Sequence, residues 1–281
     1  MLALIRFETR KVISQNKCLL GFFTIVMMNV IFVLGFFIKQ NKPGHLNRML
    51  GPELLKELFN TCVYVQTILS PCSIVIFPVL VSVIVSYVFA GEYEIGSLRL
   101  TMVRPVSRLR ILMAKWCAVS IYLGLLLVML LVTGILFSLP FMKASGSLII
   151  IGDIFSLPQR FIVHAEGFES YSRIFFSYLL AWPMLLSISC MSFMFATMTR
   201  NFALSAILSS TVYLSCYVAS LLPFLSGIHP FLPTRYMPFW KYVMLEKIPW
   251  DGAIFTDAIW TLAFSLVFFI IAAIFYEKND F

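Results

Sequence analysis

Charged side chains are scarce in this chain. Lys, Arg, Asp and Glu make up only 12% of the 281 residues, whereas hydrophobic residues make up 60%. A soluble domain of this length needs a much larger polar complement to cover its surface. The composition therefore predicts an integral membrane protein. The excess of 21 basic over 13 acidic residues then indicates contacts with membrane headgroups rather than with nucleic acid.

Charge is absent altogether from six long apolar runs, which contain no Asp, Glu, Lys or Arg. Ion-coupled carriers usually hold a carboxylate or another ionisable group at membrane depth. The absence therefore argues against a proton-coupled carrier. It argues less strongly against a sodium-coupled carrier, because backbone and hydroxyl oxygens can bind sodium.

Several enzyme motifs are missing as well. The sequence has no H-E-x-x-H for a zinc protease, no pair of Asp residues within the apolar runs, and no G-x-x-x-x-G-K-[ST] for binding nucleotide phosphates. Its six cysteines form no C-x-x-C pair, and we interpret them as small buried hydrophobic residues. We expect a protein that is not an enzyme, holds no metal or cofactor, and takes its energy from another chain.

Each apolar run is long enough for one transmembrane helix, which needs about 20 apolar residues. The runs predict an all-α membrane fold in a single domain, residues 1–281. The predicted spans lie near 18–38, 68–89, 116–137, 174–197, 202–222 and 258–276. The second and fifth runs are longer than one span. We expect their surplus, 58–67 and the Pro-rich 223–234, to extend along the membrane surface.

Residues 1–17 predict an amphipathic helix that lies on the membrane surface. On a helical wheel Leu2, Ile5, Thr9, Val12 and Ile13 share one face. A signal peptide is the alternative, but the next apolar run has full span length and no small-residue cleavage site follows it. Basic residues are denser in the segments on the N-terminal side of the membrane. This density predicts that both termini are cytoplasmic.

The loop between the second and third predicted spans reads GEYEIGSLRLTMVRPVSRLRILMAKW, residues 91–116. As a helix, its first part aligns Ile95 and Leu98 on an apolar stripe beside a polar one, which suits a position between a membrane and a soluble partner. Pro105 is expected to end this helix, and Ser107 to cap the next one. A generic basic loop explains the Arg and Lys residues, but not the two glutamates or the glycines that flank them.

This loop resembles the signature of the type-2 permease family of ABC transporters. The resemblance rests on Gly91-Glu92-x-Glu94-x-Gly96-Ser97-Leu98, Arg104-Pro105-Val106-Ser107-Arg108 and Lys115. It departs from the family at Ser97, where Thr is frequent. In that family an elbow helix, here 1–17, precedes six spans, and this loop forms the coupling helix, here 91–104, that docks on an ATP-binding subunit. In sequence the resemblance is specific over 90–115, and in architecture it covers the whole chain.

The resemblance implies the permease subunit of an ATP-driven exporter in the cytoplasmic membrane. Two copies of a separate ATPase are expected to bind ATP and Mg, and the permease to pair with an identical or related permease. The expected docking residues are Glu92, Glu94, Arg99, Arg104 and Arg108. We expect an amphipathic or hydrophobic substrate. Candidates for lining its path are Asn29, Ser205 and Ser209, although serine in membrane helices more often packs one helix on another.

Two other functions stay open on the sequence alone. One is a membrane scaffold or assembly protein that does not transport. The other, with less support, is a secondary carrier or channel. Copurification of an ATPase with a Walker motif distinguishes the permease from the scaffold.

Overall fold

The computed structural model describes residues 1–41, 59–94, 96, 107–143, 146–151, 162–245, 248–250 and 252–278. Six helices in this part of the chain are long and apolar enough to cross a membrane, which confirms the prediction of an all-α membrane protein with six spans. They comprise Cys18–Ile38, Thr61–Glu94, Arg108–Ser138, Phe168–Thr199, Phe202–Leu221 and Ala253–Lys278. Each predicted span falls on one of these helices.

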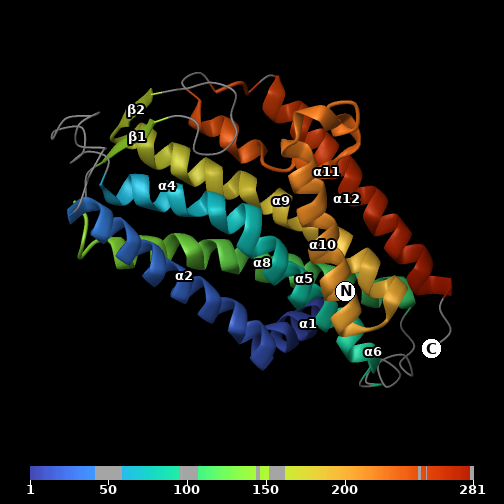
Figure 1. The fold of residues 1–281 in the computed structure, drawn as a ribbon. Coiled ribbons are helices and arrows are strands. Elements are labelled where there is room, and N and C mark those ends of the chain that lie inside the picture. The colour runs from blue at the N-terminus through green and yellow to red at the C-terminus, as the bar shows by residue number, and fades with distance from the viewer. Residues whose placement is uncertain are drawn as a thin grey trace.

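The elements are labelled in Figure 1. The long helices and their parts are α1 (Leu2–Ser14), α2 (Asn16–Asn41), α4 (Thr61–Pro71), η1 (Cys72–Ile76), α5 (Phe77–Ser86), η2 (Tyr87–Gly91), α6 (Glu92–Glu94), α8 (Arg108–Ser138), α9 (Phe168–Thr199), α10 (Phe202–Leu221) and α12 (Ala253–Lys278). The short elements are β1 (Ser147–Ile151), β2 (Ile162–Glu166), η3 (Pro223–Leu225), η4 (His229–Phe231), α11 (Pro233–Tyr236) and η5 (Phe239–Met244).

The second span is one continuous helical rod built from α4, η1, α5, η2 and α6. Its η1 and η2 turns are π-helical and therefore wider than α-helical turns. Pro78 has no N–H to donate, and in an ordinary helix its ring would clash with the carbonyl of Ile74. The wide η1 turn contains Ile74 and so accommodates this proline. The rod begins at Thr61, so residues 61–67 continue the span as a helix rather than forming the separate surface extension predicted from the sequence.

A two-stranded hairpin covers one end of the bundle and was not predicted. Strands β1 and β2 pair antiparallel, with Ser147 opposite Glu166. Asn60 fastens α4 beneath the hairpin, because its Oδ1 accepts from Val63 N at 2.8 Å while its Nδ2 donates to Ser147 O at 2.6 Å. This end, where β1 and β2 lie, is called the hairpin end; the opposite end, where α6 and the end of α12 lie, is called the α6 end (Figure 1).

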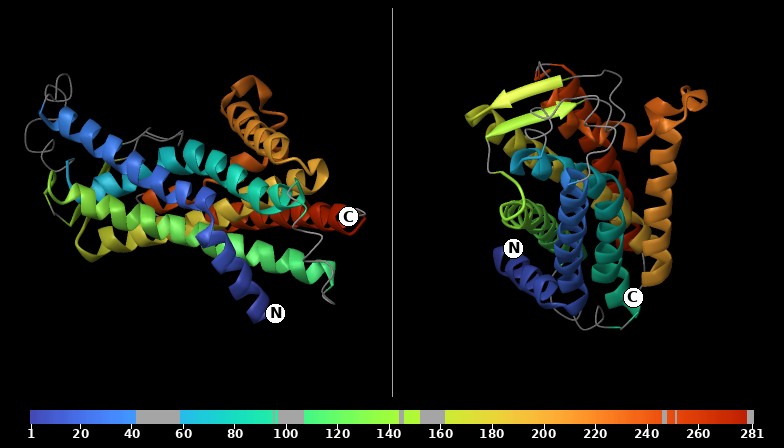
Figure 2. Two further views of the ribbon diagram at one scale, coloured as in Figure 1. Left: turned by 90° about the horizontal axis from the view of Figure 1, so that it is seen from below. Right: turned by 60° about the vertical axis from the view of Figure 1, so that its left-hand side comes forward.

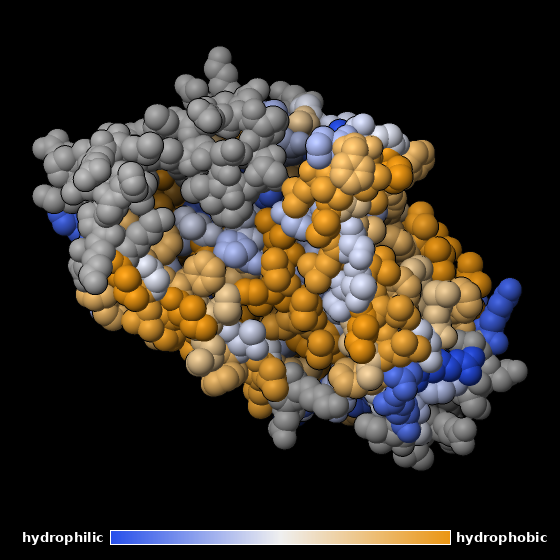
Figure 3. Space-filling model, in the orientation of Figure 1, coloured by the Kyte–Doolittle hydropathy of each residue, from blue (hydrophilic) through white to orange (hydrophobic). Residues whose placement is uncertain are grey.

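Helix α9 packs against α12, α5 and α10, whereas α8 packs against α1, α2 and α4. The face of the bundle that Figure 3 shows is largely apolar between its two ends. Buried polar groups tie helices together: Asn29 of α2 donates to Thr133 Oγ1 of α8 at 2.9 Å, and Tyr64 of α4 donates to the Asn29 carbonyl at 3.0 Å. Such bonds satisfy polar groups that would otherwise be costly inside a bilayer.

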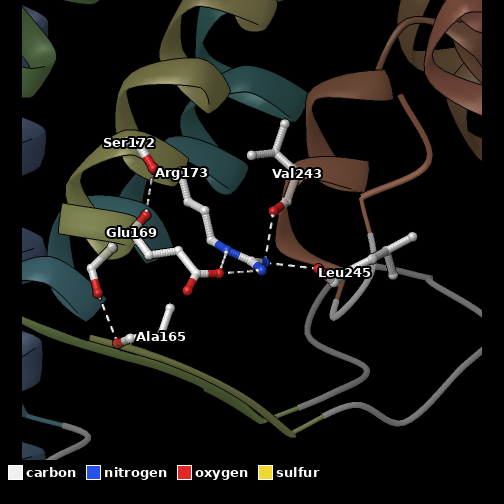
Figure 4. Close-up of polar contacts among 7 residues, drawn as sticks. Ala165, Glu169, Ser172, Arg173, Val243 and Leu245 are labelled. Carbon is white, nitrogen blue, oxygen red and sulfur yellow. Dashed lines mark hydrogen bonds and ion pairs between the residues drawn. The ribbon is translucent and has the colours of Figure 1, made fainter. Parts of the chain in front are cut away.

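At the hairpin end, Arg173 holds the segment before α12 against α9 (Figure 4). Its Nε and Nη2 donate to Glu169 Oε1 at 3.0 and 2.7 Å. Its Nη1 donates to the carbonyls of Val243 and Leu245 at 3.2 and 2.7 Å, where η5 ends. The guanidinium is therefore shared between a carboxylate and the C-terminal carbonyls of a short helix, which favour a cation. Burial in the same segment lowers the pKa of Lys241 to about 8.

Candidate functional site

A buried ionic cluster lies at the α6 end, where the rod of the second span ends. It consists of Lys11, Glu92 and Lys115 and is called the Glu92 cluster. Lys11 Nζ lies 2.8 Å from Glu92 Oε1, and Lys115 donates to the other carboxylate oxygen. The side chain of Lys115 is 1% exposed and that of Glu92 is 8% exposed. A buried charge is tolerated only when it is paired and hydrogen-bonded, and Lys115 Nζ also donates to the Val88 carbonyl at 3.1 Å.

The three residues of the Glu92 cluster come from helices far apart in sequence: α1, α6 and α8. Helix α1 reaches the cluster because the chain turns sharply at Gln15 and α1 packs against α8 (Figure 2). Val12 and Glu8 of α1 are each only 1% exposed. Val12, at one edge of the stripe predicted to face the membrane, therefore packs against the protein instead. The cluster thus joins the N-terminal helix to the end of the second span and the start of the third.

A second set of contacts joins α6 to the turn between α9 and α10. Glu94 Oε1 accepts a hydrogen bond from Phe202 N at 3.0 Å, at the first residue of α10. Asn201 caps the same helix by accepting from Leu204 N at 2.9 Å. Arg200 adopts a left-handed backbone conformation with φ 55°, and its guanidinium lies 5.3 Å from the Tyr93 ring centroid. A carboxylate at the positive end of α10 is also favoured by the helix dipole.

The start of α8 contacts the end of α12. Arg108 Nη1 donates to the Glu277 carbonyl at 3.0 Å, one residue before α12 ends. A cation is favoured at this position by the unpaired carbonyls and the dipole of a helix C-terminus. Ser107 occupies the N-cap position of α8 as predicted, but its side chain makes no capping hydrogen bond.

These contacts surround the two flanks of segment 95–106. The flank before it is bonded to α1, α8 and α10, and the flank after it is bonded to α12. A displacement of the segment would therefore pull on four helices at once. Among the described residues no three His, Cys, Asp or Glu side chains are grouped to hold a metal ion.

The structure describes three of the five predicted docking residues. Glu92 is buried and paired with two lysines, so its carboxylate is not displayed for a partner as we expected. Glu94 is exposed but caps α10, and Arg108 is half-buried against α12. Arg99 and Arg104, like most of the predicted coupling helix, lie outside the described residues.

Lys115, the last residue of the permease signature, is buried within the Glu92 cluster. The burial of both partners was missed because the sequence shows the charges but not the return of α1 against α8. The only available signal was that Glu92 and Lys115 border predicted spans, whereas Lys11 lies within the predicted elbow helix.

The three predicted path residues are fully buried and bonded within the chain. Asn29 joins α2 to α8, as described above. Ser205 donates to the Phe202 carbonyl at 3.0 Å, and Ser209 donates to the Ser205 carbonyl at 2.8 Å, so both hydroxyls are satisfied inside α10. All three residues are 0% exposed, so none lines an open path in this conformation.

Comparison with known proteins gives a family for the chain. No curated protein matches its sequence. A family model described as "Protein of unknown function (DUF2705)" matches residues 49–281, which include every helix of the bundle from α4 to α12. Because this match covers far more than half of the sequence, the chain belongs to the DUF2705 family.

Proposed function

We propose that this protein is the membrane-spanning permease subunit of an ATP-driven ABC exporter. A separate ATPase would bind and hydrolyse ATP, and the six spans would carry an amphipathic or hydrophobic substrate across the cytoplasmic membrane. The observation that carries the proposal is the anchoring of both flanks of segment 95–106 to α1, α8, α10 and α12. Because its flanks are bonded to these helices, a movement of the segment that a bound soluble partner causes would be transmitted to them. A loop with unbonded flanks would move without displacing the helices.

The location of charge supports an external source of energy. Glu92 and Lys115 lie near one end of the bundle and neutralise each other. The middle parts of the six spans carry no Asp, Glu, Lys or Arg that could bind a transported proton. The sequence also has no phosphate-binding loop of its own.

The contacts divide the predicted docking residues into two roles. We assign docking on the ATPase to segment 95–106, with Arg99 and Arg104 as its charged contacts. We assign Glu92, Glu94 and Arg108 to the transfer of motion, because each is bonded to another helix of this chain. The substrate path would then form between this chain and a second permease, identical or related, rather than at Asn29, Ser205 or Ser209.

Affinity purification from native membranes tests this proposal. A tagged full-length chain should copurify with a soluble ATPase that carries a Walker motif, and the reconstituted complex should hydrolyse ATP. Arg99→Glu with Arg104→Glu should release the ATPase, whereas Arg110→Glu should retain it, because Arg110 lies on the exposed first turn of α8. Recovery of the chain with partners that include no ATPase would refute the permease and favour a scaffold.

A further inference from the structure

The two faces of α1 carry different kinds of charge. Its buried face holds Glu8 and Val12, and Lys11 reaches from it to Glu92. Its outward face holds Arg6 and Arg10, one helical turn apart, and both are exposed. Neither arginine has an ion-pair partner among the residues that the structure describes. The acidic group of this helix is therefore turned inward and its arginines are turned outward.

Exposed apolar side chains lie among these arginines. Leu2 is 83% exposed and Phe7 is 55% exposed, and both share the outward face of α1 with Arg6 and Arg10. A surface that faces only water would not favour this apolar area, and a surface inside the hydrocarbon would not accept the arginines. Alternating basic and apolar side chains match the boundary where lipid phosphates meet acyl chains.

Charged residues of both signs are exposed around α1 at the α6 end. Arg110 at the start of α8 and Lys278 at the end of α12 are exposed there, as are Glu94 and Glu277, whereas Glu8 and Glu92 are buried. Hydrophilic side chains gather at this end of the molecule, beyond the apolar surface of the bundle (Figure 3). Because α1 leads directly into the span of α2, its outward face lies close to the membrane boundary.

From this placement we infer that the outward face of α1 binds anionic phospholipid, with Arg6 and Arg10 on the headgroup phosphates and Leu2 and Phe7 among the upper acyl chains. Basic residues at an anionic membrane surface each add attraction, and apolar side chains next to them add contacts that do not depend on salt. This inference does not rest on the proposed transport function, since it concerns a surface that the bundle presents whatever the bundle carries.

The test is thermal melting of the full-length chain in detergent, titrated with dioleoyl phosphatidylglycerol or with dioleoyl phosphatidylcholine. A lipid that binds the folded state raises the melting temperature, so the lipid concentration at half-maximal shift reports its affinity. Phosphatidylglycerol should act at lower concentrations than phosphatidylcholine. Arg6→Gln and Arg10→Gln should each raise the half-maximal concentration by roughly fivefold, and the double variant should lose the preference.

Matched variants separate the two kinds of contact. Phe7→Gln should weaken the binding of both lipids and leave the salt dependence of phosphatidylglycerol binding unchanged. The arginine variants should reduce that salt dependence. Arg235→Gln alters an exposed arginine of α11, a helix for which no packing against α1 is seen in the described part of the chain, and should have no effect.

Three results would overturn the inference. The first is equal loss of the lipid preference in Arg235→Gln and in the α1 variants. The second is an equal melting shift from inorganic phosphate, which would indicate a site for free anions. The third is an unchanged lipid preference in the double variant together with loss of a soluble protein partner, which would assign the face to an acidic protein.

Discussion

At the scale of single residues, one carboxylate pairs with two lysines in the Glu92 cluster. Replacing only one of these charged residues should therefore destabilise the fold. Lys115 has two oxygen partners, the Glu92 carboxylate and the Val88 carbonyl, and it is almost fully buried. Removing the carboxylate leaves the ammonium with one neutral partner in a region of low dielectric. Lys11 is less affected, because its side chain is 31% exposed and can turn to water.

We therefore expect Glu92→Gln to destabilise the fold by about 3–5 kcal/mol, the usual cost of breaking a buried ion pair. Thermal melting of the purified chain measures this loss. The double variant Glu92→Leu with Lys115→Met should recover most of the stability, because it removes both buried charges together. If the double variant melts below Glu92→Gln, the cluster is not held by charge pairing.

Lys241 gives the fold a pH dependence at the hairpin end. The folded chain releases this proton near pH 8, whereas the unfolded chain holds it up to the ordinary lysine pKa of 10.5. The unfolded state thus binds more protons between these values, so stability should rise with pH across this window. Tyr242, whose pKa burial raises to about 12, stays protonated throughout. The melting temperature should rise from pH 8 to 10 in the native protein and stay flatter in Lys241→Met.

At the scale of elements, α10 depends on α6 for part of its N-terminal capping. Glu94 accepts a hydrogen bond from the first amide of α10, that of Phe202. Asn201 accepts one from the amide of Leu204. A lost cap acceptor costs about 0.5–2 kcal/mol and is felt in the first turn of the helix. This contact is independent of the Glu92 cluster, although the two glutamates are neighbours in α6.

Glu94→Ala should speed amide hydrogen exchange at 202–205 by severalfold and leave exchange at 210–220 unchanged. Glu94→Gln should fall between the native chain and the alanine variant, because an amide oxygen still accepts a hydrogen bond. Arg110→Ala, a change of similar exposure on α8, should have no effect on α10. Equal exchange at 202–205 in all the variants would mean that Glu94 does not cap this helix in solution.

The elements were predictable from the sequence to different degrees. Long uncharged runs define the six helices because the membrane imposes one length and one polarity on each of them. The hairpin was missed although SLIII and the IV of IVHAE are β-branched-rich runs, because each strand is short and each pairs with a segment more than ten residues away. The helical-wheel pattern of the N-terminal residues identified α1 as an amphipathic helix. Such a pattern does not distinguish an apolar face that contacts lipid from one that packs against α8.

At the scale of the whole molecule, the fold sets the two ends of the bundle apart. Helix α6, the α9–α10 turn and the end of α12 lie at one end, and the hairpin lies at the other (Figure 1). The basic residues of the α6 end predict that this end is cytoplasmic.

Cysteine labelling in a cysteine-free background tests the orientation. Tyr171→Cys at the hairpin end should react with an impermeant reagent in intact cells, because Tyr171 is 56% exposed. Ser107→Cys at the α6 end should react only after the cells are opened. The reverse pattern would place segment 95–106 outside the cell and remove the basis for the proposed ATPase.

The candidate site was less predictable than the fold because its contacts join residues that are far apart in the sequence. Residues 91–116 showed unusual glutamates, and these do mark the site. Their roles depend on α1, α10 and α12, whose inner ends approach α6 only in the folded bundle. A loop motif therefore located the site but assigned the buried Glu92 to the surface that docks on the ATPase.

The order in which the chain is made bears on the Glu92 cluster. Lys11 leaves the ribosome first, Glu92 follows as the second span is completed, and Lys115 enters with the third. An unpaired Lys115 makes insertion of the start of α8 into lipid costly, because its charge would be buried without a partner. Glu92, which is already at the membrane boundary, lowers this cost by pairing with it. The second and third spans should therefore integrate as a pair. A chain truncated after residue 138 should insert both spans, whereas the same truncation carrying Glu92→Gln should leave the third span shifted toward the cytoplasm.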